Sequence, residues 1–367
     1  MPTCSARWIC HPPCRSASTN TEERVMLDRR RFLSIAATGA VLGSMPFGRA
    51  LTGPAAAPVP TIWKGVALGA LASMTLVHPD RPHAQAMIDR CLAEIDRLES
   101  VFSLYRTDSA LSRLNATGRL DDPPAELVEL LSFGLSLAQA SGGAFDPTVQ
   151  PLLRLYIDHF SRPDASPFGP SALAIGRARQ RVGFADVEVE PGRIRLGRPG
   201  AAITLNGVAQ GFITDRVAEL LQAEGFDDVL IDLGEGRALG QRPEGGPWRA
   251  AVADPAAPGR TLFELPLGSG SQRSALATSG GYGTRFGPDP RIHHLLDPRT
   301  GRSANHHASV SVAAPRATLA DGLSTTLSIL SPERRARLLA DHPSVRAWFV
   351  DAAGRVTGPS GEPAGQA

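Results

Sequence analysis

The clearest hydrophobic pattern in this chain is helical and lies between residues 83 and 102. Apolar residues recur there every three or four positions, which predicts a long helix with one buried face. A second helix is expected after Pro123 and Pro124, and Gly142 ends it. The full set of expected helices covers residues 83–102, 125–140, 152–160, 170–182, 211–225, 320–330 and 332–340.

Short apolar or alternating runs between glycines and prolines predict strands. The expected strands cover residues 62–76, 187–189, 193–196, 202–205, 229–234, 248–252, 261–267, 275–278, 308–314 and 345–351. Because strands and helices come in groups rather than alternating, the predicted fold class is α+β. We expect one large unit over residues 61–352, with a flexible tail over 353–367.

The first fifty residues have the pattern of an export signal rather than of a folded domain. Arg29, Arg30 and Arg31 precede a mildly apolar run over residues 32–45. This order is typical of a bacterial twin-arginine (Tat) signal, so residues 26–50 predict export and a periplasmic location. A membrane anchor is the weaker interpretation, since the run is short of the roughly 20 residues that span a bilayer. We expect residues 1–25 to be a non-native extension and 51–60 to be a linker.

Composition and charge limit which classes of ligand, membrane segment and disulfide the chain can have. A net charge of +2 leaves no basic footprint for nucleic acid. No membrane span is expected after the signal. Cys4, Cys10 and Cys14 precede it, so Cys91 alone would remain and no internal disulfide is expected. A metal site built from the early cysteines and His11 is the weaker alternative.

The stretch from His293 to Leu327 carries the most chemistry. Asp321, Ser324 and Thr325 are three and four residues apart, so a helix would place their oxygens on one face. Hard divalent cations such as Mg²⁺ prefer oxygen ligands of this kind. The alternative is a well-capped helix without a metal. In either case we expect Asp321 to be a surface carboxylate.

Five other segments combine glycines with polar or aromatic residues, at 102–115, 141–149, 204–215, 231–236 and 278–281. Tyr105 is suited to stacking on a ring-bearing ligand. Backbone amides beside Gly143 or Gly207 can approach a ring or an anion closely. Taken singly, each segment is as well explained by an ordinary turn.

Their order along the chain resembles the ApbE family of FAD:protein FMN transferases. The resemblance rests on FSLYRTDSALSRLN, GGAFDPTV, the block from Gly207 to Asp215, IDLGEG, ATSGGY, HHLLDPRTG and ADGLSTTL, and it covers about residues 62–351. It implies mixed, T-fold-like sheets with packed helices. It also implies that FAD and Mg²⁺ bind, and that FMN passes to a Thr or Ser of a partner flavoprotein, periplasmic or membrane-associated, with release of AMP.

The resemblance also implies roles for individual residues. The Mg²⁺ ligands would be Asp321, Ser324, Thr325 and the backbone carbonyl near Gly207, and His294 would be the general base. A purely structural role of His294 in its turn is the alternative. The FAD contacts would be Leu68, Tyr105, Ala144, Phe145, Asp146, Thr204, Gln210 and Leu296.

The chain departs from the family pattern at several of these positions. Leu68 replaces the usual Met, Thr204 replaces an acid, and Gln210 replaces a Lys. We expect weaker contact with FAD, and an intact Asp321 site. Two other functions remain open: an FAD-binding accessory protein that helps to mature a respiratory metalloenzyme, and Mg²⁺-dependent hydrolysis of FAD to FMN and AMP.

Overall fold

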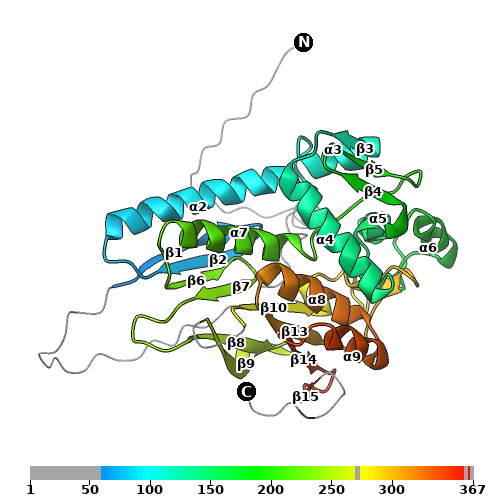
Figure 1. Ribbon diagram of the computed structural model, residues 1–367. Helices are drawn as coiled ribbons and strands as arrows, with labels where there is room; N and C mark the ends of the chain where they lie inside the picture. Colours follow the sequence, from blue (N-terminus) through cyan, green and yellow to red (C-terminus); the bar gives the residue numbers. More distant parts are fainter. Residues whose placement is uncertain (1–58, 269–272, 359–362, 364–367) are drawn as a thin grey trace, which may run out of the picture.

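The computed structural model describes residues 59–268, 273–358 and 363 (Figure 1). The predicted extension, export signal and most of the linker lie outside these residues. An antiparallel sheet of eight strands forms the centre of the molecule. In spatial order its strands are β1 (Thr61–Ala67), β2 (Ala70–Leu76), β6 (Val229–Asp232), β7 (Gly236–Leu239), β10 (Ala275–Gly280), β13 (Ser309–Ala314), β14 (Arg346–Val350) and β15 (Val356–Thr357).

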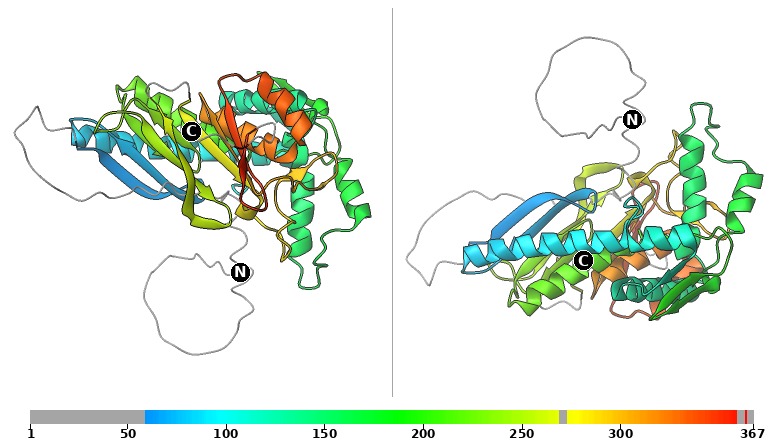
Figure 2. Two further views of the ribbon diagram at one scale, coloured as in Figure 1. Left: turned by 90° about the horizontal axis from the view of Figure 1, so that it is seen from below. Right: turned by 90° about the horizontal axis from the view of Figure 1, so that it is seen from above.

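The two faces of this sheet are covered by different elements. The helices α2 (Arg81–Phe102), α7 (Ala209–Ala223) and α8 (Ala317–Ile329) pack on one face, and the hairpin of β8 (Trp248–Asp254) and β9 (Ala257–Leu267) packs on the other (Figure 2). Successive strand residues point to opposite faces. On β13, Val312 and Ala314 therefore join the core under the helices, whereas Ala313 joins the cluster under the hairpin.

The other half of the molecule is mainly helical. It contains α3 (Ala110–Thr117), α4 (Ala125–Ser141), α5 (Gln150–Phe160), α6 (Ala172–Arg179) and a small sheet in the order β3 (Arg119–Asp121), β5 (Arg193–Leu196), β4 (Val187–Glu190). Short 3-10 turns lie at η1 (Pro147–Val149), η2 (Phe184–Asp186) and η3 (Gly281–Gly283). An apolar cluster joins α5 and α6 to Leu296, the first residue of the ribbon β11 (Leu296–Asp297) and β12 (Arg302–Ser303). The ribbon therefore ties this half to the main sheet.

Most predicted elements are confirmed, including α9 (Pro332–Ala340), and the class is α+β. Within residues 59–268 and 273–358, no helix combines the length and the apolar character that a bilayer crossing requires. The stretch 62–76 is a hairpin rather than one strand, turning at Leu68 and Gly69 with φ of 54° and 75°. Positive φ at both turn residues matches the twist of the flanking strands. Part of the expected tail also pairs as β15 with β14.

One predicted strand is wrong, and several short elements were not predicted. Residues 202–205 run as an irregular segment, because their backbone groups bond to a side chain and a loop instead of a strand. Asn115 bonds both backbone groups of Ile203, and Thr204 donates its N–H to the carbonyl of Pro147 at 2.8 Å. The unpredicted elements include α3, which Ser109 caps through the N–H of Ser112, and the short strands β3, β7, β11 and β12.

Candidate functional site

A pocket lies where the two halves of the molecule meet, and most of the predicted site residues line it. Its walls come from the loop before α5, the irregular segment before α7, the end of β10, the β11 ribbon and α8. They are formed by Ala144, Phe145, Asp146, Pro147, Val149, Leu153, Thr204, Asn206, Gly207, Ser279, Thr284, His294, Leu295, Leu296, Pro298, Thr325 and Ile329. Apolar side chains dominate, with polar groups at a few points, which suits a ring-bearing ligand.

Hydroxyl groups gather on one side of the pocket. The Oγ of Ser279 lies 2.7 Å from the Oγ of Ser324 and 3.3 Å from the Oγ1 of Thr325. Gly207 lies directly opposite, since an added Cβ there would be 3.2 Å from the Oγ1 of Thr325 and 3.3 Å from the ring of Phe145. A glycine is therefore needed for this close approach. Ser324 is fully buried and donates to the Asp321 carbonyl at 2.9 Å, so it lies behind Ser279.

Asp321 is buried beside this hydroxyl cluster, with 3% of its surface exposed. It had been expected to be a surface carboxylate, and that expectation is wrong. Its Oδ2 accepts the backbone N–H of Gly211 at 3.0 Å. Burial raises the pKa of Asp321 to about 7, and the Gly211 hydrogen bond opposes this shift. Glu235 is also buried, and burial together with the charge of Asp321 holds its pKa well above the usual range.

These oxygens fit a hard divalent cation. Within the described part of the chain, no three side chains of His, Cys, Asp or Glu are grouped as metal ligands. A cation here would therefore depend on one carboxylate together with hydroxyl and carbonyl oxygens, which is the chemistry that Mg²⁺ accepts. Asp321, Thr325 and the carbonyl near Gly207 supply such oxygens, and the buried, unneutralised carboxyl group favours a positive ion beside it.

His294 lines the pocket and has one ring nitrogen without a hydrogen-bond partner among the described residues. Its Nδ1 lies 3.2 Å from the carbonyl oxygen of Thr284, to which it can only donate. The Nε2 is inaccessible to water and has no hydrogen-bond partner among the described residues. Burial lowers the pKa of His294 to about 4, and the neighbouring His293 adds to the shift. The imidazole is therefore neutral near pH 7 and keeps a lone pair on Nε2.

Asp146 shapes its loop more than it faces the pocket. Its Oδ1 accepts from the N–H and the hydroxyl of Thr148 at 2.8 and 2.6 Å, and its Oδ2 accepts from the N–H of Phe184 at 3.2 Å. Burial raises its pKa despite these bonds. The carboxylate thus holds the loop that brings Ala144 and Phe145 to the pocket wall.

Five predicted residues lie outside the lining of the pocket. Asp321 and Ser324 lie just behind it. Leu68 is buried in the β1–β2 turn, and Tyr105, which follows α2, is 45% exposed. Gln210, in the first turn of α7, packs against Gly234, and its buried Nε2 has no partner among the described residues. Burial raises the pKa of Tyr105, so its hydroxyl stays protonated.

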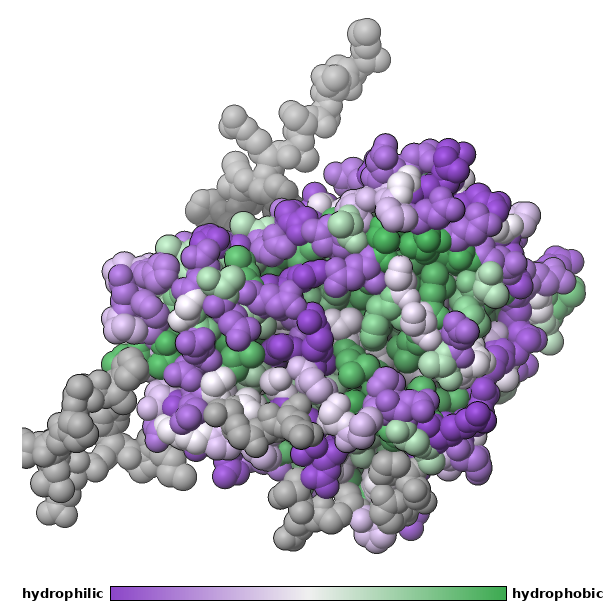
Figure 3. Space-filling model, in the orientation of Figure 1, coloured by the Kyte–Doolittle hydropathy of each residue, from purple (hydrophilic) through white to green (hydrophobic). Residues whose placement is uncertain are grey.

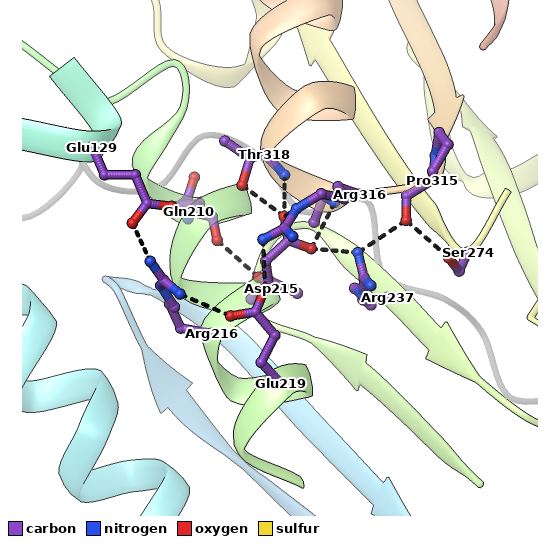
Figure 4. Close-up of polar contacts among 12 residues, drawn as sticks. Glu129, Gln210, Asp215, Arg216, Glu219, Arg237, Ser274, Pro315, Arg316 and Thr318 are labelled. Carbon is purple, nitrogen blue, oxygen red and sulfur yellow. Dashed lines mark hydrogen bonds and ion pairs between the residues drawn. The ribbon is translucent and has the colours of Figure 1, made fainter. Parts of the chain in front are cut away.

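Asp215 holds the start of α8, the helix that carries Asp321. No separate role for Asp215 was predicted from the sequence. Its carboxylate is fully buried and accepts from the N–H groups of Ala317 and Thr318 at 2.8 and 2.9 Å (Figure 4). Arg237 and Arg316 also donate to it. Helix α8 begins at Arg316 without a side-chain cap of its own, so α7 supplies the cap from outside. In the sequence, the lack of a capping residue before Ala317 was the signal that another element caps α8.

Gly211 completes the contact between these helices. An added Cβ at Gly211 would lie 2.7 Å from the Ala317 carbonyl carbon and 2.8 Å from the Cβ of Asp321. Only a glycine lets α7 and α8 cross this closely. Helix α7 therefore holds α8 at two points one turn apart, through Asp215 at the start of α8 and through the Gly211 N–H at Asp321.

Comparison with known proteins identifies the family. The ApbE family model matches residues 68–349. The FAD:protein FMN transferase of Klebsiella pneumoniae (strain 342) is 31% identical over 302 residues, which cover 80% of this chain and 85% of that protein. The FAD:protein FMN transferase of Haemophilus influenzae is 32% identical over 257 residues, covering 68% and 73% of the two chains.

Solved structures agree with this assignment. The apo form of the Pseudomonas stutzeri flavinyl transferase ApbE matches with a TM-score of 0.68 and 30% identity, over 81% of this chain and 93% of that one. The ApbE protein of Thermotoga maritima matches with a TM-score of 0.72 and 26% identity, over 82% and 97%. The predicted ApbE-like fold is confirmed, and the chain belongs to the ApbE family.

Proposed function

We propose that this protein transfers FMN from FAD to a threonine or serine hydroxyl of a partner protein and releases AMP. The observation that carries the proposal is the pairing of two groups at one pocket. His294 offers an uncharged base, and the oxygens around Asp321 offer a cation site. The relatives named as FAD:protein FMN transferases support the same reaction.

The reaction forms a bond between the acceptor oxygen and the phosphorus of the FMN moiety, and it breaks the bond from that phosphorus to the oxygen of AMP. Mg²⁺ held by Asp321, Thr325 and the carbonyl near Gly207, with Ser324 behind them, would neutralise the phosphate charge and make the phosphorus more electrophilic. The protein then has to position the two reactants and accept one proton.

His294 is suited to accept that proton. Because its Nδ1–H is held by the Thr284 carbonyl, the lone pair of Nε2 is left without a hydrogen-bond partner among the described residues. An acceptor hydroxyl would donate its proton to Nε2 as its oxygen attacks phosphorus. The apolar wall formed by Leu295, Leu296 and Ile329 limits the entry of water, which favours transfer to a protein over hydrolysis.

The acceptor is proposed to be a periplasmic or membrane-associated flavoprotein. Support comes from the twin arginines, Arg29 and Arg30, before the apolar run. A fusion of residues 26–50 to a reporter that fluoresces after Tat export should become periplasmic. Replacement of both arginines by lysine should keep the reporter in the cytoplasm, and an unchanged location would contradict the proposed route.

The proposed reaction can be tested by following covalent flavin. The protein is incubated with FAD, Mg²⁺ and a threonine-containing acceptor of another ApbE-family transferase, and the denatured acceptor is examined for flavin fluorescence. Wild-type protein should label the acceptor only when Mg²⁺ is present. The His294→Ala variant should bind FAD but label slowly. Absence of labelling by a wild-type protein that binds FAD would rule out the transferase function.

A further inference from the structure

A second and wider hollow lies on the far side of α5 from the pocket. Helix α5 separates the two, since Val149 and Leu153 line the pocket whereas Gln150 and Arg154 line the hollow. The irregular segment before α7 also connects them, with Ala202 in the hollow and Thr204 in the pocket. A molecule bound in this hollow would therefore lie beside the transfer site without blocking it.

Three arginines give the hollow its charge. Arg154 on α5 and Arg177 on α6, with Arg181 just after α6, line it together, and Asp158 is its one acidic side chain. All three arginines are exposed, and none forms a salt bridge within the described part of the chain. We call this group the arginine hollow. Grouping like charges without partners does not stabilise the free protein, so the cluster is better explained by an anionic ligand.

Arginines on the neighbouring small sheet behave differently. Arg119 and Arg193 both pair with Asp121, and Arg195 pairs with Glu188. Arg113 on α3 and Arg179 on α6 are exposed and, like the arginines of the hollow, form no salt bridge within the described residues. The arginine hollow differs from these isolated side chains because three arginines line one concave surface together.

One exposed apolar residue shares a helix face with an arginine of the hollow, and another lies in the loop between α5 and α6. Leu173 is 65% exposed and lies four residues before Arg177, on the same face of α6. Phe168, 84% exposed, stands at a turn closed by the hydrogen bond from the N–H of Gly169 to the carbonyl of Ser166. In Figure 3, hydrophilic residues dominate the end of the molecule that carries α5 and α6, with some hydrophobic residues among them. Apolar anchors beside arginines are typical of protein interfaces.

We propose that the arginine hollow docks an acidic segment of the acceptor protein while its threonine enters the pocket. The identity of the partner, the acceptor protein, rests on the proposed transferase function. The acidic character of the docked segment rests on charge complementarity with the three arginines. Arginine forks bind aspartate and glutamate side chains in pairs of hydrogen bonds, and they speed the encounter of oppositely charged proteins.

Direct binding tests this inference separately from catalysis. The probe is a short fluorescent peptide with one threonine and a run of aspartates, compared with the same peptide carrying asparagines. Fluorescence anisotropy with the full chain should show the aspartate peptide binding roughly tenfold more tightly, with a strong dependence on salt. The variant Arg154→Glu/Arg177→Glu/Arg181→Glu should lose this preference. Arg81→Glu/Arg337→Glu/Arg346→Glu, an equal charge change at three exposed positions outside the hollow, should not.

Two controls make the outcome decisive. All variants should bind FAD like the wild type, because the arginine hollow is separate from the pocket. Equal binding of the two peptides, unchanged binding by the triple variant, or a preference for anionic vesicles over the peptide would each overturn the inference. Peptide binding without flavin transfer would instead count against the proposed function and leave the docking surface standing.

Discussion

Burial shifts the pKa values of His294, in the pocket, and Asp321, just behind it, in directions that suit two different roles. It lowers the pKa of His294 and raises that of Asp321, so both groups favour their neutral forms. A neutral imidazole is the form that can accept a proton. A buried carboxyl group, by contrast, becomes a stable anion only when a cation binds beside it, which links charge at Asp321 to metal binding.

Replacement of Asp321 by asparagine should separate metal binding from folding. The amide oxygen of Asp321→Asn can still accept the Gly211 N–H, so the metal-free variant should unfold at the wild-type temperature or above it. In wild type, Mg²⁺ at a hundred times its Kd should add about 2.7 kcal/mol of stability. Thermal unfolding with and without Mg²⁺ should show this gain lost in the variant. A retained gain would show that the metal binds elsewhere.

Acid should destabilise the protein partly through His294. The pKa in the folded state, about 4, lies below the ordinary value of 6.5, so the folded state binds fewer protons than the unfolded state between these values. The stability that neutral His294 contributes is thus present above pH 6.5 and is lost as the pH falls toward 4, by at most about 3 kcal/mol.

Urea unfolding at pH 7.5 and at pH 5 measures this loss. The variant His294→Asn should lose less stability between the two pH values than wild type does. Replacing His307, whose pKa burial also lowers to about 4, should have an effect in the same direction. If wild type and His294→Asn lose equal stability, the ring of His294 is not buried in the way described.

At the scale of elements, the site depends on how α7 holds α8. Asp321 and Thr325 lie on α8, and Gly207 immediately precedes α7, so the proposed ligands come from two helices and their crossing. Asp215 and Gly211 set that crossing. A shift of α8 along α7 would therefore move the Asp321 carboxylate away from the Gly211 N–H and from the segment at Gly207.

Removing the charge of Asp215 should cost both stability and metal affinity. Asp215→Asn leaves Arg237 buried without its anion and weakens the cap of α8, a loss of about 3–5 kcal/mol by urea unfolding. Mg²⁺ affinity, measured by calorimetry on the folded variant, should also fall. Glu219→Gln, which alters only the outer and partly exposed ion pairs, should cost less than about 1 kcal/mol. Unchanged Mg²⁺ affinity in Asp215→Asn would show that the cap is structural only.

The long helices were predictable, because hydrophobic periodicity alone determines where an amphipathic helix runs. Helix α2 begins and ends within two residues of its predicted limits. Residues 202–205 were mispredicted because their apolar alternation matches a strand, whereas the distant Asn115 and Pro147 take their hydrogen bonds. Helix α3 was missed because its eight residues are too few for a periodic signal.

In the candidate site, too, residues in local motifs were predictable, whereas roles that depend on tertiary contacts were not. Predicted residues in contiguous motifs, such as Ala144, Phe145 and Thr325, line one pocket, and their roles there stay predictions. The roles of Asp215 and Ser279 arise only when α7, α8 and β10 come together. Local spacing also suggested an exposed Asp321, since burial depends on the tertiary contacts of α8.

At the scale of the whole molecule, the sheet with its helices carries the proposed cation site, and the helical half supplies the opposite wall of the pocket (Figure 1). Transfer therefore requires both halves of the molecule, and each half would contact a different part of the reacting complex. Near the main sheet lie the groups that we propose act on phosphate, and on α5 and α6 lies the surface that we propose meets a partner.

The most direct test of the whole account is the balance of products in one reaction. Free AMP and flavin attached to the acceptor are quantified together, with FAD, Mg²⁺ and the acceptor present. The account predicts equal amounts of the two, both dependent on Mg²⁺ and both lost in Asp321→Asn. Release of AMP without attached flavin would show that water is the acceptor and would contradict the transferase function.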